Sequence, residues 1–162
     1  MRYHKAFLIL VITGLIMLSS QSSVMAQEHP PRPINITLAQ GIQFGTFYHG
    51  PLGGTVVVTT DGTRSTTGDV FLFGFTSSPL TFLIDANPGT IISVLPIPQV
   101  TLTGTTGGSM TMDIDSSDPL TPFVATTSST QIRFGGTLNV GNPLANPPGS
   151  YTATFFVTFN QE

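Results

Sequence analysis

Helical periodicity does not build up anywhere after residue 33, and this constrains the fold more than any other feature of the sequence. An amphipathic helix needs about ten or more residues with apolar side chains three or four positions apart. The chain instead passes through short segments rich in β-branched and aromatic residues, mostly separated by glycine, proline, asparagine or aspartate. The predicted strands occupy residues 34–38, 42–47, 55–60, 69–75, 81–86, 90–95, 100–103, 109–114, 131–140 and 151–160.

Short strands at nearly even spacing, with no helix between them, are typical of two packed antiparallel sheets. The sequence therefore predicts an all-β fold, an immunoglobulin-like or pilin-like antiparallel β-sandwich of about nine short strands. A closed barrel is the alternative, because barrel strands show much the same pattern. An outer-membrane barrel is disfavoured, since the segments are short and several of them are continuously apolar.

Several local signals refine this prediction. Asp61-Gly62 is a pair typical of tight hairpin turns, and residues 48–51, Tyr-His-Gly-Pro, also suggest a turn. Gly135-Gly136 interrupts the alternation of its strand, which indicates a bulge or a close approach of another backbone. The last predicted strand should pack one face on a core and turn the other to solvent. Its expected inner face consists of Tyr151, Ala153, Phe155, Val157 and Phe159.

The first 26 residues have the three parts of a secretory signal peptide. A basic start at 1–5 precedes an apolar run at 6–18, and the small residues near Ala26 form a cleavage site. We expect a helix that is removed on export, followed by a flexible proline-rich leader at 27–33 and a single domain at 34–162. This predicts secretion by the general export pathway to the periplasm, cell surface or surroundings of a Gram-negative bacterium. No stable membrane span is expected in the mature form.

Charge excludes two classes of partner. Without the signal peptide, three arginines and no lysine stand against eight carboxylates. A protein that binds nucleic acid needs many basic side chains to neutralise phosphates, so nucleic acid is not an expected partner. Anionic lipid headgroups are disfavoured for the same reason. So few charges also leave strand edges with little protection against pairing with other chains.

No set of residues suggests catalysis. The predicted mature chain has no cysteine or lysine to act as a nucleophile or base, and its two histidines lie in the leader (His29) and in the predicted turn (His49). The acidic stretch at 113–118 lacks the glycine and distal glutamate of an EF-hand loop. We therefore predict a protein that is not an enzyme, with no catalytic, cofactor-binding or metal-binding residues and no cofactor.

Short sequence blocks are spread over most of the chain after residue 43. The early blocks are Phe-Gly-Thr-Phe at 44–47, Gly-Thr-Val-Val-Val at 54–58 and the segment 62–70. The later blocks are residues 95–96, 100–104, 134–140 and 148–155. In order and spacing, these blocks resemble a known bacterial secreted family, called domain of unknown function 4402. The family has no assigned activity, so the resemblance implies no functional residues.

A more distant likeness concerns residues 44–47 and the Gly-Ser-Tyr-Thr segment at 149–152. Both are similar to the spore coat protein U family of archaic chaperone–usher pilins. That resemblance implies an incomplete immunoglobulin-like fold completed by a donor strand from the next subunit. The present chain differs in having no cysteine pair and only a short leader.

These observations predict a secreted, non-catalytic structural or adhesive protein of the cell surface. It would be either a pilin-like subunit or a matrix component, and it would associate with identical or related subunits through strand edges. Residues 34–38 are either a donor strand for a neighbour or the first strand of their own domain, and the second is favoured because it needs no partner. The alternative function is an extracellular module that binds carbohydrate or another ligand, with Tyr48 and His49 as candidate contacts.

Overall fold

The computed structural model describes residues 33–162, and within this range it contains eleven β-strands and no helix. The all-β prediction is confirmed. The predicted signal peptide at 1–26 and leader residues 27–32 lie outside the described residues. The strands are β1 (Asn35–Gln40), β2 (Thr46–Val58), β3 (Arg64–Phe73), β4 (Leu80–Asp85), β5 (Ile91–Val94), β6 (Val100–Gly104), β7 (Ser109–Asp118), β8 (Phe123–Val124), β9 (Ser129–Val140), β10 (Tyr151–Thr152) and β11 (Phe159–Gln161).

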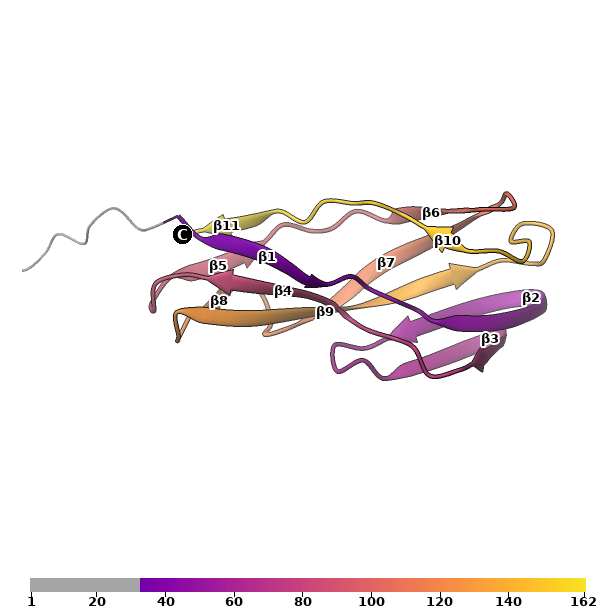
Figure 1. Cartoon of the computed structure of the whole chain (residues 1–162), viewed down its shortest axis with the longest axis horizontal. Helices are drawn as coiled ribbons and strands as arrows, with labels where there is room; N and C mark the ends of the chain where they lie inside the picture. Colours follow the sequence, from indigo (N-terminus) through magenta and orange to yellow (C-terminus); the bar gives the residue numbers. More distant parts are fainter. Residues whose placement is uncertain (1–32) are drawn as a thin grey trace, which may run out of the picture. The chain divides into compact units, whose positions relative to one another are not determined.

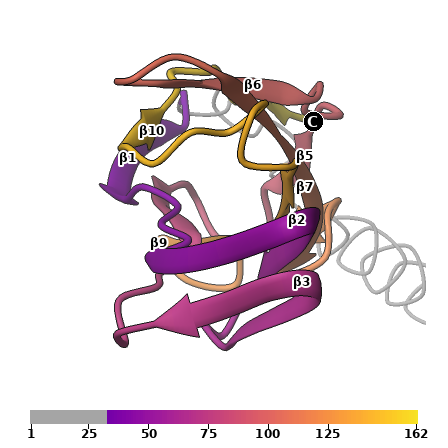
Figure 2. The ribbon, with the colours of Figure 1, turned by 90° about the vertical axis from the view of Figure 1, so that its right-hand side faces the viewer.

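Strand β9 organises an antiparallel sheet of eight strands (Figure 1). One edge of β9 pairs with β7, and the other pairs with β4 along its first half and with β2 along its second half. The sheet continues from β4 to β1, from β2 to β3, and from β7 through β6 to β10. This sheet curls around its interior (Figure 2). Strands β11, β5 and β8 form a separate sheet of three strands, labelled in Figure 1.

The interior holds two clusters of apolar side chains, and β9 contributes to both. Ile132 and Phe134 belong to one cluster, whereas Leu138 and Val140 belong to the other. These positions are an even number of residues apart, so they share one face of the strand. Burial of such side chains contributes about 1.5–3 kcal/mol each, which makes this face a main source of stability. Across residues 33–162 no helix offers an apolar stretch long enough to cross a bilayer.

Residues 34–38 belong to their own domain. β1 pairs antiparallel with β4, with Asn35 opposite Asp85 and Leu38 opposite Phe82. Only the other edge of β1 is left without a strand partner. Of the two arrangements considered for this segment, the structure therefore has the intramolecular one.

Strand β2 differs from its prediction. The separate strands at 42–47 and 55–60, with a turn at 48–51, are wrong, because one strand runs from Thr46 to Val58. Its pairing with β3 shifts between His49 and Gly54, so the intervening residues bulge. Pro51 is tolerated there because it lacks the N–H that a regular ladder requires. Gly53 has a φ of 66°, which favours glycine.

The hairpin between β2 and β3 turns at Asp61-Gly62, as predicted. Gly62 has a φ of 87°, and its N–H donates to the carbonyl of Thr59 at 2.9 Å. The predicted start of the next strand at residue 69 is wrong, since β3 begins at Arg64. Its polar first half pairs with β2 and carries no apolar alternation that would mark it as a strand. The two-residue strand β8 was not predicted.

The glycine pair in β9 marks a close backbone approach, as predicted. The extra residue lies in the partner strand, because Ile114 pairs with Gly136 and Ser116 with Gly135 while Asp115 is skipped. A Cβ atom on Gly135 would lie 2.8 Å from the carbonyl oxygen of Val58. Glycine is therefore required by crowding at this point of the sheet.

The last predicted strand is interrupted. Its start, β10, pairs with β6, and its end, β11, pairs with β5. Residues 153–158 form no ladder, because they lie by register opposite a stretch that contains Pro96 and Pro98, which have no N–H to donate. The predicted alternation is confirmed in part, since Phe155 and Val157 are partly buried but Ala153 is exposed. The Phe156 side chain, on the other face, is 87% exposed.

Candidate functional site

The curled sheet is open along one line. Its strand order runs from β1 through β4, β9, β7 and β6 to β10, and β1 and β10 do not pair with each other. Figure 2 shows these two strands at the two ends of the curl. The facing edge of β1 and the edge formed by residues 151–158 therefore present main-chain groups without strand partners. Such edges are sites at which a further strand can pair.

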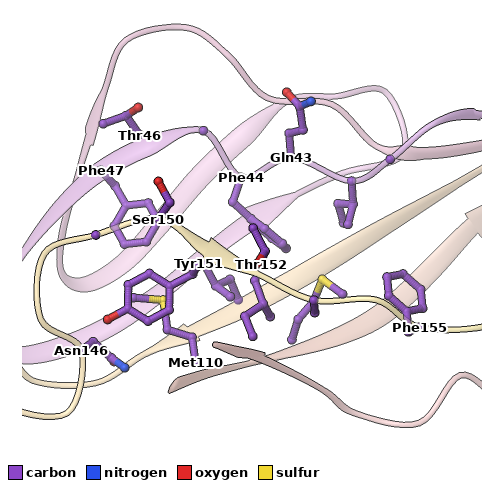
Figure 3. Close-up of a pocket in the computed structure, with 18 of the residues that line it drawn as sticks. Gln43, Phe44, Thr46, Phe47, Met110, Asn146, Ser150, Tyr151, Thr152 and Phe155 are labelled. Carbon is purple, nitrogen blue, oxygen red and sulfur yellow. The ribbon is translucent and has the colours of Figure 1, made fainter. Parts of the chain in front are cut away.

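A cavity of about 1180 Å³ lies at this opening, and we call it the groove. One wall is formed by residues 41–49 and the other by residues 146–157, as seen in Figure 3. None of the lining residues is aspartate, glutamate, lysine or arginine. Its apolar lining comprises mainly Leu38, Ile42, Phe44, Phe47, Leu80, Phe82, Leu102, Met110, Met112, Leu138, Phe155, Phe156 and Val157.

The floor of the groove is part of the core. Leu102 of β6, Met110 and Met112 of β7 and Leu138 of β9 are all buried. Methionine side chains adapt to irregular shapes because they are unbranched and have three rotatable bonds. The floor can therefore accept apolar groups of more than one shape without losing its packing.

Polar contacts fix one end of the groove. Asn146 is 1% exposed, donates to the carbonyl of Ser109 and accepts from the N–H of Gly141. The carbonyl of Asn146 lies 3.1 Å from His49 Nε2, so Nε2 must carry the proton of this contact. The Tyr151 hydroxyl donates to the carbonyl of Pro147 at 2.7 Å. These contacts tie the segment after β9 to β2 and β7, and they engage the groove's only histidine.

Arg64 holds the other wall in place. Its Nη1 atom donates to the carbonyls of Phe44 at 2.9 Å and Thr46 at 3.2 Å. Its Nη2 atom donates to the carbonyls of Gly74 at 2.6 Å and Phe73 at 3.4 Å. A planar guanidinium group can serve several acceptors in fixed directions. Arg64 thus fastens the wall at 44–46 to the end of β3, a role that the sequence did not indicate.

The two edges of the groove lack the usual protection against pairing. β1 reads Asn-Ile-Thr-Leu-Ala-Gln, and residues 151–158 read Tyr-Thr-Ala-Thr-Phe-Phe-Val-Thr. Neither contains a charged residue or a proline, the side chains that most often block an exposed edge. The outer edge of β3 differs, because it carries Arg64 and Asp69.

The acidic stretch at 113–118 lies outside the groove. Asp113 accepts hydrogen bonds from Gln99 Nε2 and from Asn139 Nδ2, each at 3.0 Å, and Asp115 accepts one from Thr137. Both carboxylates therefore bond to neighbouring polar side chains on the sheet. No group of three or more potential metal ligands occurs in the part of the chain that the structure describes.

Tyr48, a candidate ligand contact, lies at the rim of the groove and is 60% exposed. Its ring stacks on that of Phe71 with a centroid separation of 5.1 Å and an interplanar angle of 19°. His49, the other candidate, is partly buried and bonded as described above. The structure thus leaves Tyr48 accessible and engages His49 with the main chain.

The comparison with known families gives one match. A family model described as "Domain of unknown function (DUF4402)" matches residues 34–160, which is most of the chain. The match contains β1 and most of the last strand, the two sides of the groove. Neither the curated proteins nor the solved structures with which the chain was compared include a significant match.

Proposed function

Because the chain belongs to the DUF4402 family, whose function is unknown, we propose a function from the groove itself. The protein is an exported, non-catalytic structural or adhesive component of the bacterial cell surface. It associates with identical or related subunits by strand pairing at the groove. The supporting observation is that two unprotected strand edges flank an apolar cavity without charged lining residues.

Strand addition suits this arrangement for a physical reason. A strand placed in the groove would gain main-chain hydrogen bonds at one edge or at both, and its alternate side chains would enter the cavity. Leu38, which is 58% exposed at the rim, would become buried. Each apolar side chain covered in this way contributes about 1.5–3 kcal/mol before the cost of association is subtracted.

The chemistry of the groove supports a role without catalysis. Its titratable side chains are Tyr48, His49 and Tyr151, and no carboxylate lines it. His49 and Tyr151 each bond to a main-chain carbonyl. The His49 Nδ1 atom is buried and has no hydrogen-bond partner within the described residues. The groove lining offers no carboxylate, lysine or cysteine with which this histidine could share acid–base or nucleophilic chemistry, which supports binding over turnover.

The test is the association state of the exported protein, produced from the full chain with its own N-terminus. Sedimentation at increasing concentration should reveal oligomers. The variants Thr37→Lys and Thr154→Lys each place a charge on an exposed position of one groove edge and should weaken association. Thr126→Lys, at an exposed loop position outside the groove lining, is the matched control and should associate normally. A protein that remains monomeric at every concentration would rule out the proposal.

A second candidate function is the binding of a carbohydrate or similar ligand, favoured by the accessible Tyr48–Phe71 pair. An aromatic ring with an apolar body and a polar tip is suited to such contacts. A glycan array probed with the exported protein tests this idea. Binding that Tyr48→Ala removes, without any change in sedimentation, would favour ligand binding over subunit association.

A further inference from the structure

The end of β3 carries the longest run of exposed apolar side chains within residues 33–162. Phe71, Leu72 and Phe73 are all exposed, and Phe75 is fully exposed after Gly74. We call residues 71–75, Phe-Leu-Phe-Gly-Phe, the aromatic segment. A contiguous apolar patch on the surface of a soluble protein usually marks an interaction site. We therefore expect the aromatic segment to be covered by a partner.

The aromatic segment is held in one shape. Arg64 bonds to the carbonyls of Phe73 and Gly74, and Gly74 has a φ of 68° that glycine adopts without strain. Tyr48 stacks against Phe71 from the neighbouring strand. Binding by a segment that is already ordered loses less conformational entropy than binding by a flexible one. The aromatic segment is therefore already ordered before it binds a partner.

β3 also has a free edge. It pairs with β2 on one side and with no strand on the other. Arg64 and Asp69 lie in the first six residues of β3, and the aromatic segment itself carries only uncharged side chains along this edge. Two of its carbonyls, those of Phe73 and Gly74, already accept hydrogen bonds from Arg64, so the other main-chain groups of the edge would have to form the new pairing. A strand edge of this kind can add to another sheet.

The groove presents the complementary chemistry. It is uncharged and apolar, and residues 153–158 in its wall take part in no ladder. The main chain of this wall offers hydrogen-bond donors and acceptors at the spacing of an extended strand. An extended polypeptide has complementary groups at the same spacing, whereas a lipid or a sugar does not. The occupant should therefore be an extended, uncharged chain with exposed apolar side chains.

We infer that the groove of one copy receives the aromatic segment of a second copy. The free edge of β3 pairs with residues 153–158, and Phe73 and Phe75 pack against Leu38 and Phe156 at the rim. This inference rests on the proposed function and assigns the partner surface. It explains why the segment and the groove are both exposed, apolar and free of charge on a single chain.

The absence of cysteine permits a direct test by crosslinking of the full-length exported protein. Phe75→Cys and Phe156→Cys are made as separate variants, mixed and oxidised. A disulfide between the two different chains, identified by mass spectrometry, is the expected product. Leu120→Cys is the matched control for Phe156→Cys, because Leu120 is also well exposed but does not line the groove. Mixing it with Phe75→Cys should give little crosslink.

A second measurement uses sedimentation. The double variant Phe73→Ser/Phe75→Ser should raise the dissociation constant about tenfold or more, since buried aromatic anchors usually dominate an interface. Leu120→Ser/Leu144→Ser removes two equally exposed apolar side chains and should leave the dissociation constant unchanged. Both substituted pairs are exposed, so neither should prevent folding.

The outcomes separate the two proposals. If the wild-type protein associates but the serine pair has no effect and the cysteines do not crosslink, the aromatic segment is not the partner surface. Association that Thr37→Lys or Thr154→Lys weakens would then still support the proposed function. If the wild-type protein does not associate at all, both proposals fail.

Discussion

At the scale of single residues, a few polar side chains hold irregular backbone in place through hydrogen bonds, which apolar packing cannot do. Arg64, Asp61 and Asn146 each bond to two or more groups, and each joins or closes a segment of irregular backbone. Because the domain has few charged side chains, few other groups could form these hydrogen bonds if one of the three residues were replaced. Replacement of Asp61 or Arg64 should therefore have larger effects than the exposure of these two side chains suggests.

Replacing Arg64 with lysine should destabilise the fold by about 1–3 kcal/mol. An ammonium group can approach one or two carbonyls, whereas the guanidinium reaches four. Urea unfolding of the variant measures the change. Arg133→Lys is the control, because Arg133 bonds only to the exposed side chain of Gln131. Equal losses in the two variants would contradict the role given to Arg64.

The hydrogen bonds of Asp61 should make the stability of the fold depend on pH under acidic conditions. Hydrogen bonds from the Thr59 side chain, and then from the N–H and side chain of Thr63, lower the pKa of Asp61 from 3.8 to about 2. The folded pKa lies below the unfolded one, so the contribution is present above pH 3.8 and is lost as the pH falls through about 2. Thermal unfolding of Asp61→Asn should therefore show a smaller loss of stability over this window than the wild-type protein. Identical pH profiles would refute this assignment.

At the scale of elements, strands are interrupted where the backbone cannot continue a ladder. The bulge in β2 requires Gly53, and the gap in the last strand follows from Pro96 and Pro98 opposite it. The gap in the last strand shapes the groove, because residues 153–157 line it, and the bulge at 50–53 directly follows the lining residues 46–49. Both interruptions therefore lie in or next to the walls of the candidate site.

Gly53→Ala should destabilise the protein more than Gly74→Ala does. Both glycines have similar positive φ values, 66° and 68°, so the backbone strain on alanine should be similar. A Cβ atom on Gly53 would also collide with the carbonyl of Val140, whereas one on Gly74 would meet nothing within 4 Å. The difference between the two free energies of unfolding isolates the collision. A difference near zero would mean that the backbone moves aside.

The elements that could be predicted from the sequence are those defined by their own side chains. The strands near 34–38 and 131–140 alternate clearly, the strand at 81–86 ends at Asn87-Pro88-Gly89, and Asp-Gly specifies the turn at 61–62. The sequence pattern starts β3 too late because the first half of this strand is polar, and it divides β2 because Gly50 and Pro51 resemble a turn. The groove could not be predicted, because it depends on which distant strands fail to meet.

At the scale of the whole domain, an apolar interior of two clusters opens to the surface along the groove. The groove and the aromatic segment both lack charged residues. Association between such surfaces is driven by apolar burial and main-chain pairing, with little long-range electrostatic steering. The lack of charge on these surfaces should therefore determine how the proposed association depends on ionic strength.

For the proposed self-association, we expect a dissociation constant that changes little with ionic strength. Screening weakens attraction between charges but leaves uncharged surfaces largely unaffected. Sedimentation in about 0.05 M and about 0.5 M NaCl should give dissociation constants within about threefold of each other. A fall in affinity of tenfold or more at high salt would point to a charged interface elsewhere on the domain.

The two prolines opposite residues 153–158 have one further consequence. Residues 153–158 form no regular ladder with their neighbour, apart from the hydrogen bond from the N–H of Leu95 to the carbonyl of Thr158. In the proposed association, the register of an incoming chain would therefore be set mainly by the alternation of its own side chains. A chain displaced by two residues would present the same alternation, so one groove could accept segments that differ in length by a small even number.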